Sequence, residues 1–278
     1  AVNLHFGMRV PVCFPLLMLV LLAALAAPSG AAATTLSEPE RQRYAAALTL
    51  FENGQHDRAL ALAKQGLHPL ADKVLTWMDL GRPESGRDFN EINAFITANP
   101  DWPRLYALYR NAEPLLPETL SASQVLTWFG ERLPITGSGA RRHAAALWEA
   151  GQKERARLAA RQYWITVDFD SDEEVAFRQR FRTLLTPDDE IARLDRLLWD
   201  GRTTAARRQV DRVLSGPAAV ARARLALMGN RPGVDGLIGR VPSRLRNDAG
   251  LIHERAVWRR KRGRLEGVVE LLDDLPPG

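Results

Sequence analysis

The segment Trp148-Glu-Ala-Gly151-Gln-Lys-Glu-Arg-Ala156 places a glycine three residues after an aromatic residue and a small residue five positions further on. A glycine at such a position is typical of the residue that ends a helix in the left-handed conformation, which is unfavourable for residues with a Cβ atom. The small residue lets the axis of a second helix approach the first. The segment therefore predicts a helical hairpin.

The same pattern recurs three more times along the chain. Its other instances are Phe51…Gly54…Ala59, Leu198…Gly201…Ala206 and the degenerate Trp258…Gly263…Val268. Repetition of such a unit is typical of hairpins stacked in series, which present an extended binding surface. Because the glycines are irregularly spaced, we expect an irregular, TPR-like α-superhelix (an α-solenoid) rather than a regular tetratricopeptide array.

Helix starts are well marked, and no stretch shows sustained period-two alternation. Four capping-box patterns predict helix N-termini, and they pair Ser37 with Glu40, Ser121 with Gln124, Ser171 with Glu174, and Thr186 with Asp189. The strand-like stretch from Tyr163 to Phe169 continues a helical face, so we interpret it as a helix end that enters a loop. The fold class is therefore predicted to be all-α, with residues 34–278 forming one continuous scaffold domain.

The composition fits a folded domain with a mixed-charge surface. Of the 278 residues 46% are hydrophobic, and 38 basic against 33 acidic residues give a net charge of +5. A surplus of this size favours anionic partners, but a nearly even mixture of signs is usually a solvated surface.

The N-terminal residues 1–33 read as an export signal. Met8-Arg9 precedes an apolar run from Val10 to Ala27, and Ala31-Ala-Ala33 has the form of a cleavage site. A retained membrane anchor is the alternative, but Pro11 and Pro15 shorten the run below the length that spans a bilayer. We expect a mature chain from Thr34, exported and without a membrane span, and we interpret residues 1–7 as upstream of the true start.

Cysteine chemistry is not expected in the mature protein. Cys13 is the single cysteine of the chain and lies inside the predicted signal. The mature chain would therefore have no disulfide, no thiolate nucleophile and no cysteine metal site.

Two acidic motifs suggest catalysis or metal binding, but local explanations fit them better. Glu84-Ser85 lies between Pro83 and Gly86, which predicts a turn. Asp168-Phe-Asp-Ser-Asp172 has the first three carboxylates of a calcium loop but Glu173 in place of the required glycine. A helix N-terminus, where carboxylates meet the positive end of the helix dipole, explains this second motif.

The remaining candidate motifs for cofactor, metal or polyanion binding are equally weak. Gly137-Ser-Gly139 lacks the third glycine of a dinucleotide loop and is predicted to be a flexible turn, and His253-Glu254 has no second histidine at zinc-protease spacing. The basic segment Arg255 to Arg264 is interpreted as the exposed face of a hairpin, with polyanion contact as the alternative. No catalytic, cofactor-binding or metal-binding residue is predicted.

Several segments in order resemble the soluble lytic murein transglycosylases of Gram-negative bacteria. They are Phe95-Ile-Thr-Ala-Asn-Pro-Asp-Trp-Pro103, Trp128-Phe-Gly-Glu-Arg-Leu-Pro-Ile-Thr-Gly137, Ala144-Ala-Ala-Leu-Trp-Glu-Ala-Gly151, Leu184-Leu-Thr-Pro-Asp-Asp189, Leu197-Leu-Trp-Asp-Gly201, and the stretch from Val241-Pro to Trp258-Arg-Arg260. The resemblance covers roughly Phe89 to the end of the chain and is weaker before it.

The resemblance implies a periplasmic enzyme of cell-wall turnover, in which an N-terminal α-superhelix precedes a lysozyme-like catalytic domain. That domain cleaves the β-1,4 bond between N-acetylmuramic acid and N-acetylglucosamine without water and leaves a 1,6-anhydro product. Its glutamate, usually followed by Ser, and its Gly-Leu-Met-Gln segment have no counterpart in this chain, and Leu227-Met-Gly229 is only a fragment of the latter.

The chain is therefore expected to be a scaffold truncated at its C-terminus, which contacts peptidoglycan glycan strands and a downstream catalytic domain. No nucleic-acid partner is expected. The alternative is a stand-alone periplasmic helical-repeat adaptor that binds a protein partner.

Overall fold

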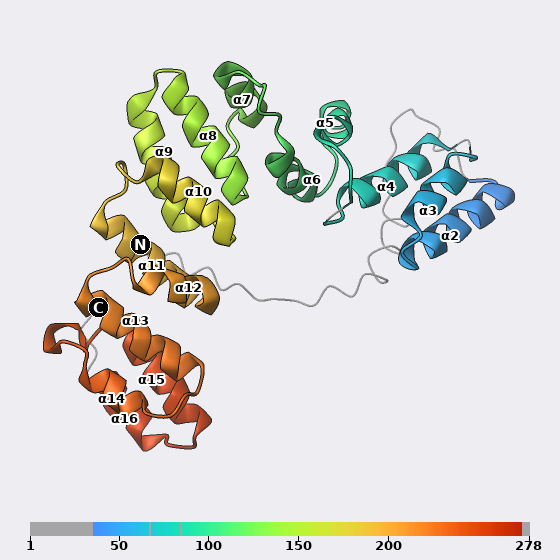
Figure 1. Cartoon of the computed structure of the whole chain (residues 1–278). Helices are drawn as coiled ribbons and strands as arrows, with labels where there is room; N and C mark the ends of the chain where they lie inside the picture. Colours follow the sequence, from blue (N-terminus) through green and yellow to red (C-terminus); the bar gives the residue numbers. More distant parts are fainter. Residues whose placement is uncertain (1–35, 67, 84, 274–278) are drawn as a thin grey trace. The chain divides into compact units, whose positions relative to one another are not determined.

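The computed structural model describes residues 36–66, 68–83 and 85–273 (Figure 1). Within these ranges the chain forms α-helices joined by short connections, two 3₁₀ turns and no strand, which confirms the predicted all-α class. The predicted signal segment, Cys13 and Glu84 lie outside the described residues. The superhelical arrangement of the helices stays a prediction.

The described residues fall into two compact units, one up to Thr76 and the other from Trp77. The first contains α2 (Glu38–Glu52), α3 (His56–Ala63) and most of α4 (Pro69–Leu80), and the division falls inside α4. The sequence predicts a single scaffold domain over residues 34–278, and this stays a prediction beside the two units found here.

The α-helices that lie wholly within the second unit are between 6 and 14 residues long. Its elements are α5 (Phe89–Ala98), α6 (Leu105–Ala112), η1 (Glu113–Leu115), α7 (Ala122–Phe129), α8 (Gly137–Glu149), α9 (Lys153–Thr166), α10 (Ser171–Phe181), α11 (Pro187–Trp199), α12 (Thr203–Val210), α13 (Ser215–Met228), α14 (Val234–Gly239), η2 (Ser243–Leu245), α15 (Ala249–Lys261) and α16 (Glu266–Asp273).

The four predicted hairpins are confirmed. They pair α2 with α3, α8 with α9, α11 with α12 and α15 with α16, and Figure 1 shows α8 and α9 side by side. Their turn glycines, Gly54, Gly151, Gly201 and Gly263, have φ of +76°, +78°, +68° and +72°.

Each of these turns closes with the same two hydrogen bonds. In the turn at Gly151 the glycine N–H donates to the carbonyl of Trp148 at 3.2 Å, and the next N–H, from Gln152, donates to Leu147 at 2.9 Å. This pair defines a Schellman motif, which satisfies carbonyls that the end of a helix leaves open. The small residues of the first three hairpins, Ala59, Ala156 and Ala206, are fully buried.

A fifth hairpin of the same kind joins α13 to α14. Asn230 takes the left-handed conformation with φ of +49°, its N–H donates to the carbonyl of Leu227, and the N–H of Arg231 donates to Ala226. The sequence pattern missed this turn because it required glycine, whereas asparagine also tolerates the left-handed conformation.

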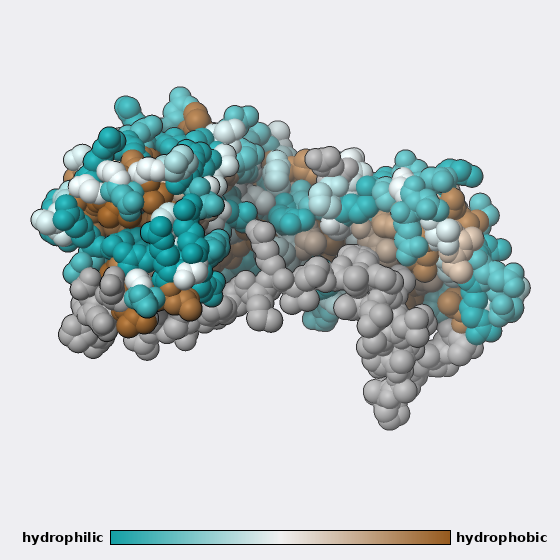
Figure 2. All heavy atoms as spheres, turned by 90° about the horizontal axis from the view of Figure 1, so that it is seen from below, coloured by the Kyte–Doolittle hydropathy of each residue, from teal (hydrophilic) through white to brown (hydrophobic). Residues whose placement is uncertain are grey.

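Apolar side chains from successive helices form the cores between the hairpins. One cluster joins α8, α9 and α10 around the fully buried Trp164, and a second joins α11, α12 and α13 around Leu197 and Ala206. A third joins α13, α14 and α15 around Leu227 and Leu251. Hydrophilic residues dominate the face drawn in Figure 2, and its hydrophobic residues form small patches.

The interpretation of Gly137-Ser-Gly139 as a flexible turn is wrong, because these residues form the first turn of α8. Both glycines are buried, and a Cβ atom on Gly139 would lie 2.2 Å from a carboxylate oxygen of Glu113. The absence of Cβ atoms lets two carboxylates approach the N-terminus of α8. Glu113 accepts from the N–H of Thr136 at 2.7 Å, and Glu173 accepts from that of Ser138 at 2.8 Å.

The predicted capping boxes at Ser37, Ser121 and Thr186 are confirmed, but the one at Ser171 is wrong by one residue. The cap of α10 is Asp170, whose carboxylate accepts from the N–H groups of Asp172 and Glu173. Glu174 does not fold back onto the cap, because its buried carboxylate accepts hydrogen bonds from arginines of neighbouring helices.

Replacing the turn glycine Gly151 with alanine tests the hairpin geometry. No atom lies within 4 Å of a Cβ added there, so the cost is conformational alone and we expect Gly151→Ala to lower the unfolding free energy by about 1 kcal/mol. Gly236→Ala is the matched control, since its Cβ also meets nothing within 4 Å but lies within helix α14. Urea denaturation should show no loss for this control, and equal losses in both variants would contradict the assignment.

Candidate functional site

The first helices of three successive hairpins, α11, α13 and α15, pack against one another. They bring together aromatic, acidic and basic side chains that no single stretch of sequence contains. We call this group the Trp199 face, and it consists of Asp195, Trp199, Arg224, Asp248, His253 and Glu254.

Trp199 is the aromatic centre of this face. It is the last residue of α11 and remains 49% exposed. Its ring centroid lies 5.3 Å from that of His253, and the guanidinium carbon of Arg224 lies 4.9 Å from the indole centroid. The indole is thus held by two neighbours while about half of its surface stays available.

Arg224 lies beneath the indole and is only 1% exposed. Its Nη1 donates to Asp195 at 2.6 Å and lies 4.0 Å from the carboxylate of Asp248. Gly250 makes room for it, because a Cβ atom there would come within 2.1 Å of the guanidinium carbon. Nε and Nη2 of Arg224 have no hydrogen-bond partner among the described residues.

Glu254 is the second buried charge of the face. It is only 8% exposed. Burial raises its pKa, and the neighbouring His253, Arg224 and Lys261 only partly oppose this effect. A carboxyl group with a pKa raised by desolvation beside specific charges is typical of functional positions.

The chemistry of the Trp199 face fits a ligand with alternating apolar and hydroxyl surfaces. An exposed indole offers an apolar surface with little conformational entropy to lose, and the flanking carboxylates of Asp195 and Asp248 accept hydrogen bonds. Their side chains are 52% and 34% exposed. A sugar ring has this combination of C–H faces and hydroxyl groups.

The acidic segment from Asp168 to Asp172 stabilises the fold through ion pairs and a helix cap. Asp168 pairs with Arg196 at 2.7 Å and with Arg202, and Asp170 caps α10. In the described part of the chain no three His, Cys, Asp or Glu side chains are grouped as metal ligands.

His143 is paired with Tyr163 within the second unit. Its Nδ1 lies 2.8 Å from the hydroxyl of Tyr163, and burial lowers the pKa of His143 to about 4. His143 is therefore neutral at neutral pH.

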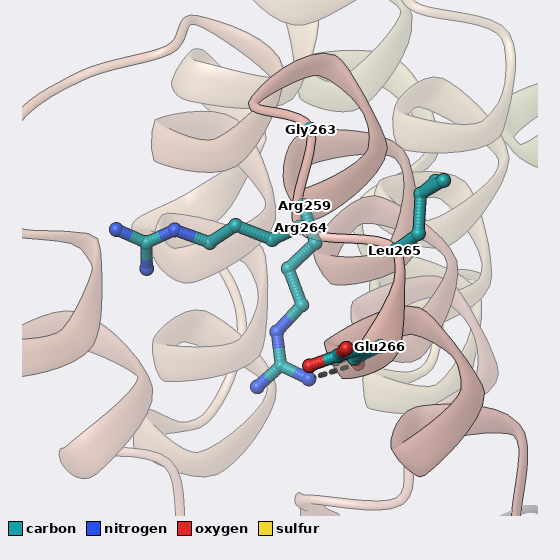
Figure 3. Close-up of a pocket in the computed structure, with 6 residues that line it drawn as sticks. Arg259, Gly263, Arg264, Leu265 and Glu266 are labelled. Atoms are coloured by element: carbon teal, nitrogen blue, oxygen red, sulfur yellow. Dashed lines mark hydrogen bonds between the residues drawn. The ribbon is translucent and has the colours of Figure 1, made fainter.

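The basic segment forms the end of α15 and the turn at Gly263. Arg259 donates to the carbonyl of Gly267, and Arg262 lies 4.2 Å over the ring of Trp258. Figure 3 shows a surface pocket at this turn in which the guanidinium groups of Arg259 and Arg264 point in different directions. These contacts fit the exposed face of a hairpin. The basic residues in the last turn of α15 also complement the negative end of its helix dipole.

Sequence reasoning missed the Trp199 face. The hairpin pattern uses Leu198, Gly201 and Ala206 and gives Trp199 no role, and the sequence treats His253-Glu254 only as an incomplete zinc motif. One local signal was present, because Asp195 and Trp199 are four residues apart and share one side of a helix.

Comparisons with family models, curated proteins and solved structures found no match to the chain. Among the described residues no helix has the length and apolar character needed to cross a bilayer.

The raised pKa of Glu254 predicts a specific pH dependence. Where the folded-state pKa of an acid lies above the unfolded value, stability falls as the pH rises from the ordinary carboxyl range through the raised pKa. We expect Glu254→Gln to be more stable than the parent at pH 7 and equally stable below the ordinary carboxyl pKa. Thermal unfolding across pH measures this, with the exposed Glu52→Gln as control; a less stable E254Q at pH 7 would contradict it.

Proposed function

We propose that this chain is the N-terminal scaffold of a periplasmic peptidoglycan lytic transglycosylase and that its Trp199 face contacts glycan strands. The proposal combines the ordered sequence resemblance with the chemistry of this face. The scaffold would hold the polymer, and the glutamate of a downstream lysozyme-like domain would cleave it to the 1,6-anhydro product.

Two of the segments that carry the resemblance form connections between helices and pack against the helices they join, as expected for a scaffold. Between α5 and α6, Trp102 packs edge-on against Phe95 at 5.6 Å and against Trp77 at 6.4 Å. After α7, Arg132 lies 3.5 Å over the ring of Tyr109 and donates to the carbonyl of Trp128 at 2.6 Å. The same segment ends in the Ile135 and Thr136 N–H groups that bind Glu113.

The single observation that favours a glycan ligand is the half-exposed indole of Trp199 beside partly exposed carboxylates. The predicted superhelix would present an extended surface that suits a strand-like polymer. The net charge of +5 adds a weak attraction for the anionic peptides that peptidoglycan carries.

The second candidate function is a stand-alone periplasmic adaptor. An exposed tryptophan is also typical of protein interfaces, where aromatic residues and arginine are enriched. An adaptor would use the same face for a protein partner and would not need a glycan.

Co-sedimentation with purified sacculi separates the two functions. We expect the chain from Thr34 to sediment with sacculi and Trp199→Ala to bind about tenfold more weakly, which corresponds to about 1.4 kcal/mol of binding free energy. Tyr106→Ala is the matched control, because Tyr106 is an aromatic residue of α6 that is 62% exposed and lies outside the Trp199 face. Binding that is absent, or equally weakened in both variants, would refute the glycan contact.

A second test concerns the reaction itself. The chain alone should release no anhydromuropeptides from sacculi, and the coding sequence after Gly278 should continue into a Glu-Ser segment and a Gly-Leu-Met-Gln segment. A stop codon at this point would refute the role as part of an enzyme and would favour the adaptor.

A further inference from the structure

Three arginines, from α11, α12 and the turn after α12, surround one buried carboxylate in the second unit. Glu174 of α10 has a side chain only 1% exposed. It accepts from Arg208 at 2.9 Å and from Arg212, and Arg193 lies 3.5 Å away on α11. One negative charge therefore faces three positive charges at this point.

The neighbouring carboxylate, that of Glu190, does not neutralise the excess of positive charge. Glu190 accepts from Trp164 at 3.0 Å, from Gln209 at 2.6 Å and from Arg178 at 3.1 Å. Gln209 connects the two carboxylates, since its Oε1 also accepts from Arg212 at 3.1 Å.

The cluster therefore carries two more positive than negative charges. Its four guanidinium groups are those of Arg178, Arg193, Arg208 and Arg212, against the two carboxylates of Glu174 and Glu190. The neighbouring pair of Arg161 and Asp189, at 2.8 Å, adds one charge of each sign and leaves the surplus unchanged.

Three of the four guanidinium groups in the cluster are partly exposed. Arg193 is completely buried and stacks 4.3 Å from the centroid of Trp164, so it cannot reach a ligand. The side chains of Arg178, Arg208 and Arg212 are 43%, 33% and 21% exposed. We call these three residues the arginine edge.

The arginine edge has guanidinium N–H donors that no described residue uses. Arg208 uses Nε and Nη2 for Glu174, Arg212 uses Nη1, and Arg178 uses Nε. Their other N–H groups meet no acceptor among the described residues. Guanidinium groups held in place by internal carboxylates bind an added oxyanion with little further loss of side-chain entropy.

We propose that the arginine edge binds an oxyanion, either a carboxylate or a phosphate group of a ligand. The bound anion would offset the surplus charge of the cluster, and the spare N–H groups would form charge-assisted hydrogen bonds with its oxygens. The inference does not rest on the proposed function, because it needs neither the Trp199 face nor a glycan.

Calorimetric titration and thermal unfolding test the site with two probes, inorganic phosphate and glutarate, at ionic strength held constant with sodium chloride. We expect saturable binding and a rise in the unfolding midpoint of the chain from Thr34. Arg178→Gln and Arg212→Gln should each weaken binding about tenfold. The probe that binds more tightly identifies the preferred oxyanion.

Arg222→Gln is the matched control. Arg222 forms an exposed pair with Asp211 at 3.1 Å, so this variant loses the same charge outside the cluster. Binding should be unchanged in it. Two results would overturn the proposal: no saturable binding of either probe, or equal weakening in all three variants, which would show a general charge effect. Arg178→Gln keeps the test valid if Arg212→Gln unfolds, because Arg178 is the most exposed of the three.

Discussion

The second unit depends on the burial of one positive charge, that of Arg193. Its Nη1 donates to the carbonyl of Trp164 at 2.6 Å and lies 3.3 Å from that of Val167, at the C-terminal end of α9. A buried guanidinium group is tolerated only where carbonyls, an aromatic face and a carboxylate replace water. Glu174 of α10 completes this environment, so α9, α10 and α11 are fixed around a single side chain.

The features that sequence reasoning predicted correctly are those that depend on a few neighbouring residues. A turn glycine such as Gly201 and a cap such as Thr186 satisfy hydrogen bonds within one helix turn, so their patterns are local. One error arises where a distant side chain intervenes, because Glu113 occupies the space that a Cβ atom on Gly139 would need. The other error is local, since Asp170 and Glu173 form a capping box one residue before the predicted one.

The candidate site could not be predicted in the same way. Trp199, Arg224 and His253 come from three helices, and only the packing of these helices brings Arg224 and His253 to 4.9 Å and 5.3 Å from the indole ring of Trp199. Residue spacing gives no information on such distances. A buried polar residue such as Arg224 is also indistinguishable in sequence from the many exposed arginines of this chain.

The five Schellman turns have a consequence for the order in which the chain folds. Each turn joins helices adjacent in sequence, and no atom lies within 4 Å of the Cβ position at Gly54, Gly151, Gly201 or Gly263. A hairpin of this kind can form before any distant segment is available, which gives low contact order and rapid folding. A chain delivered from its N-terminus could therefore assemble hairpin by hairpin, and Arg193 would be buried only once α11 had packed against α9 and α10.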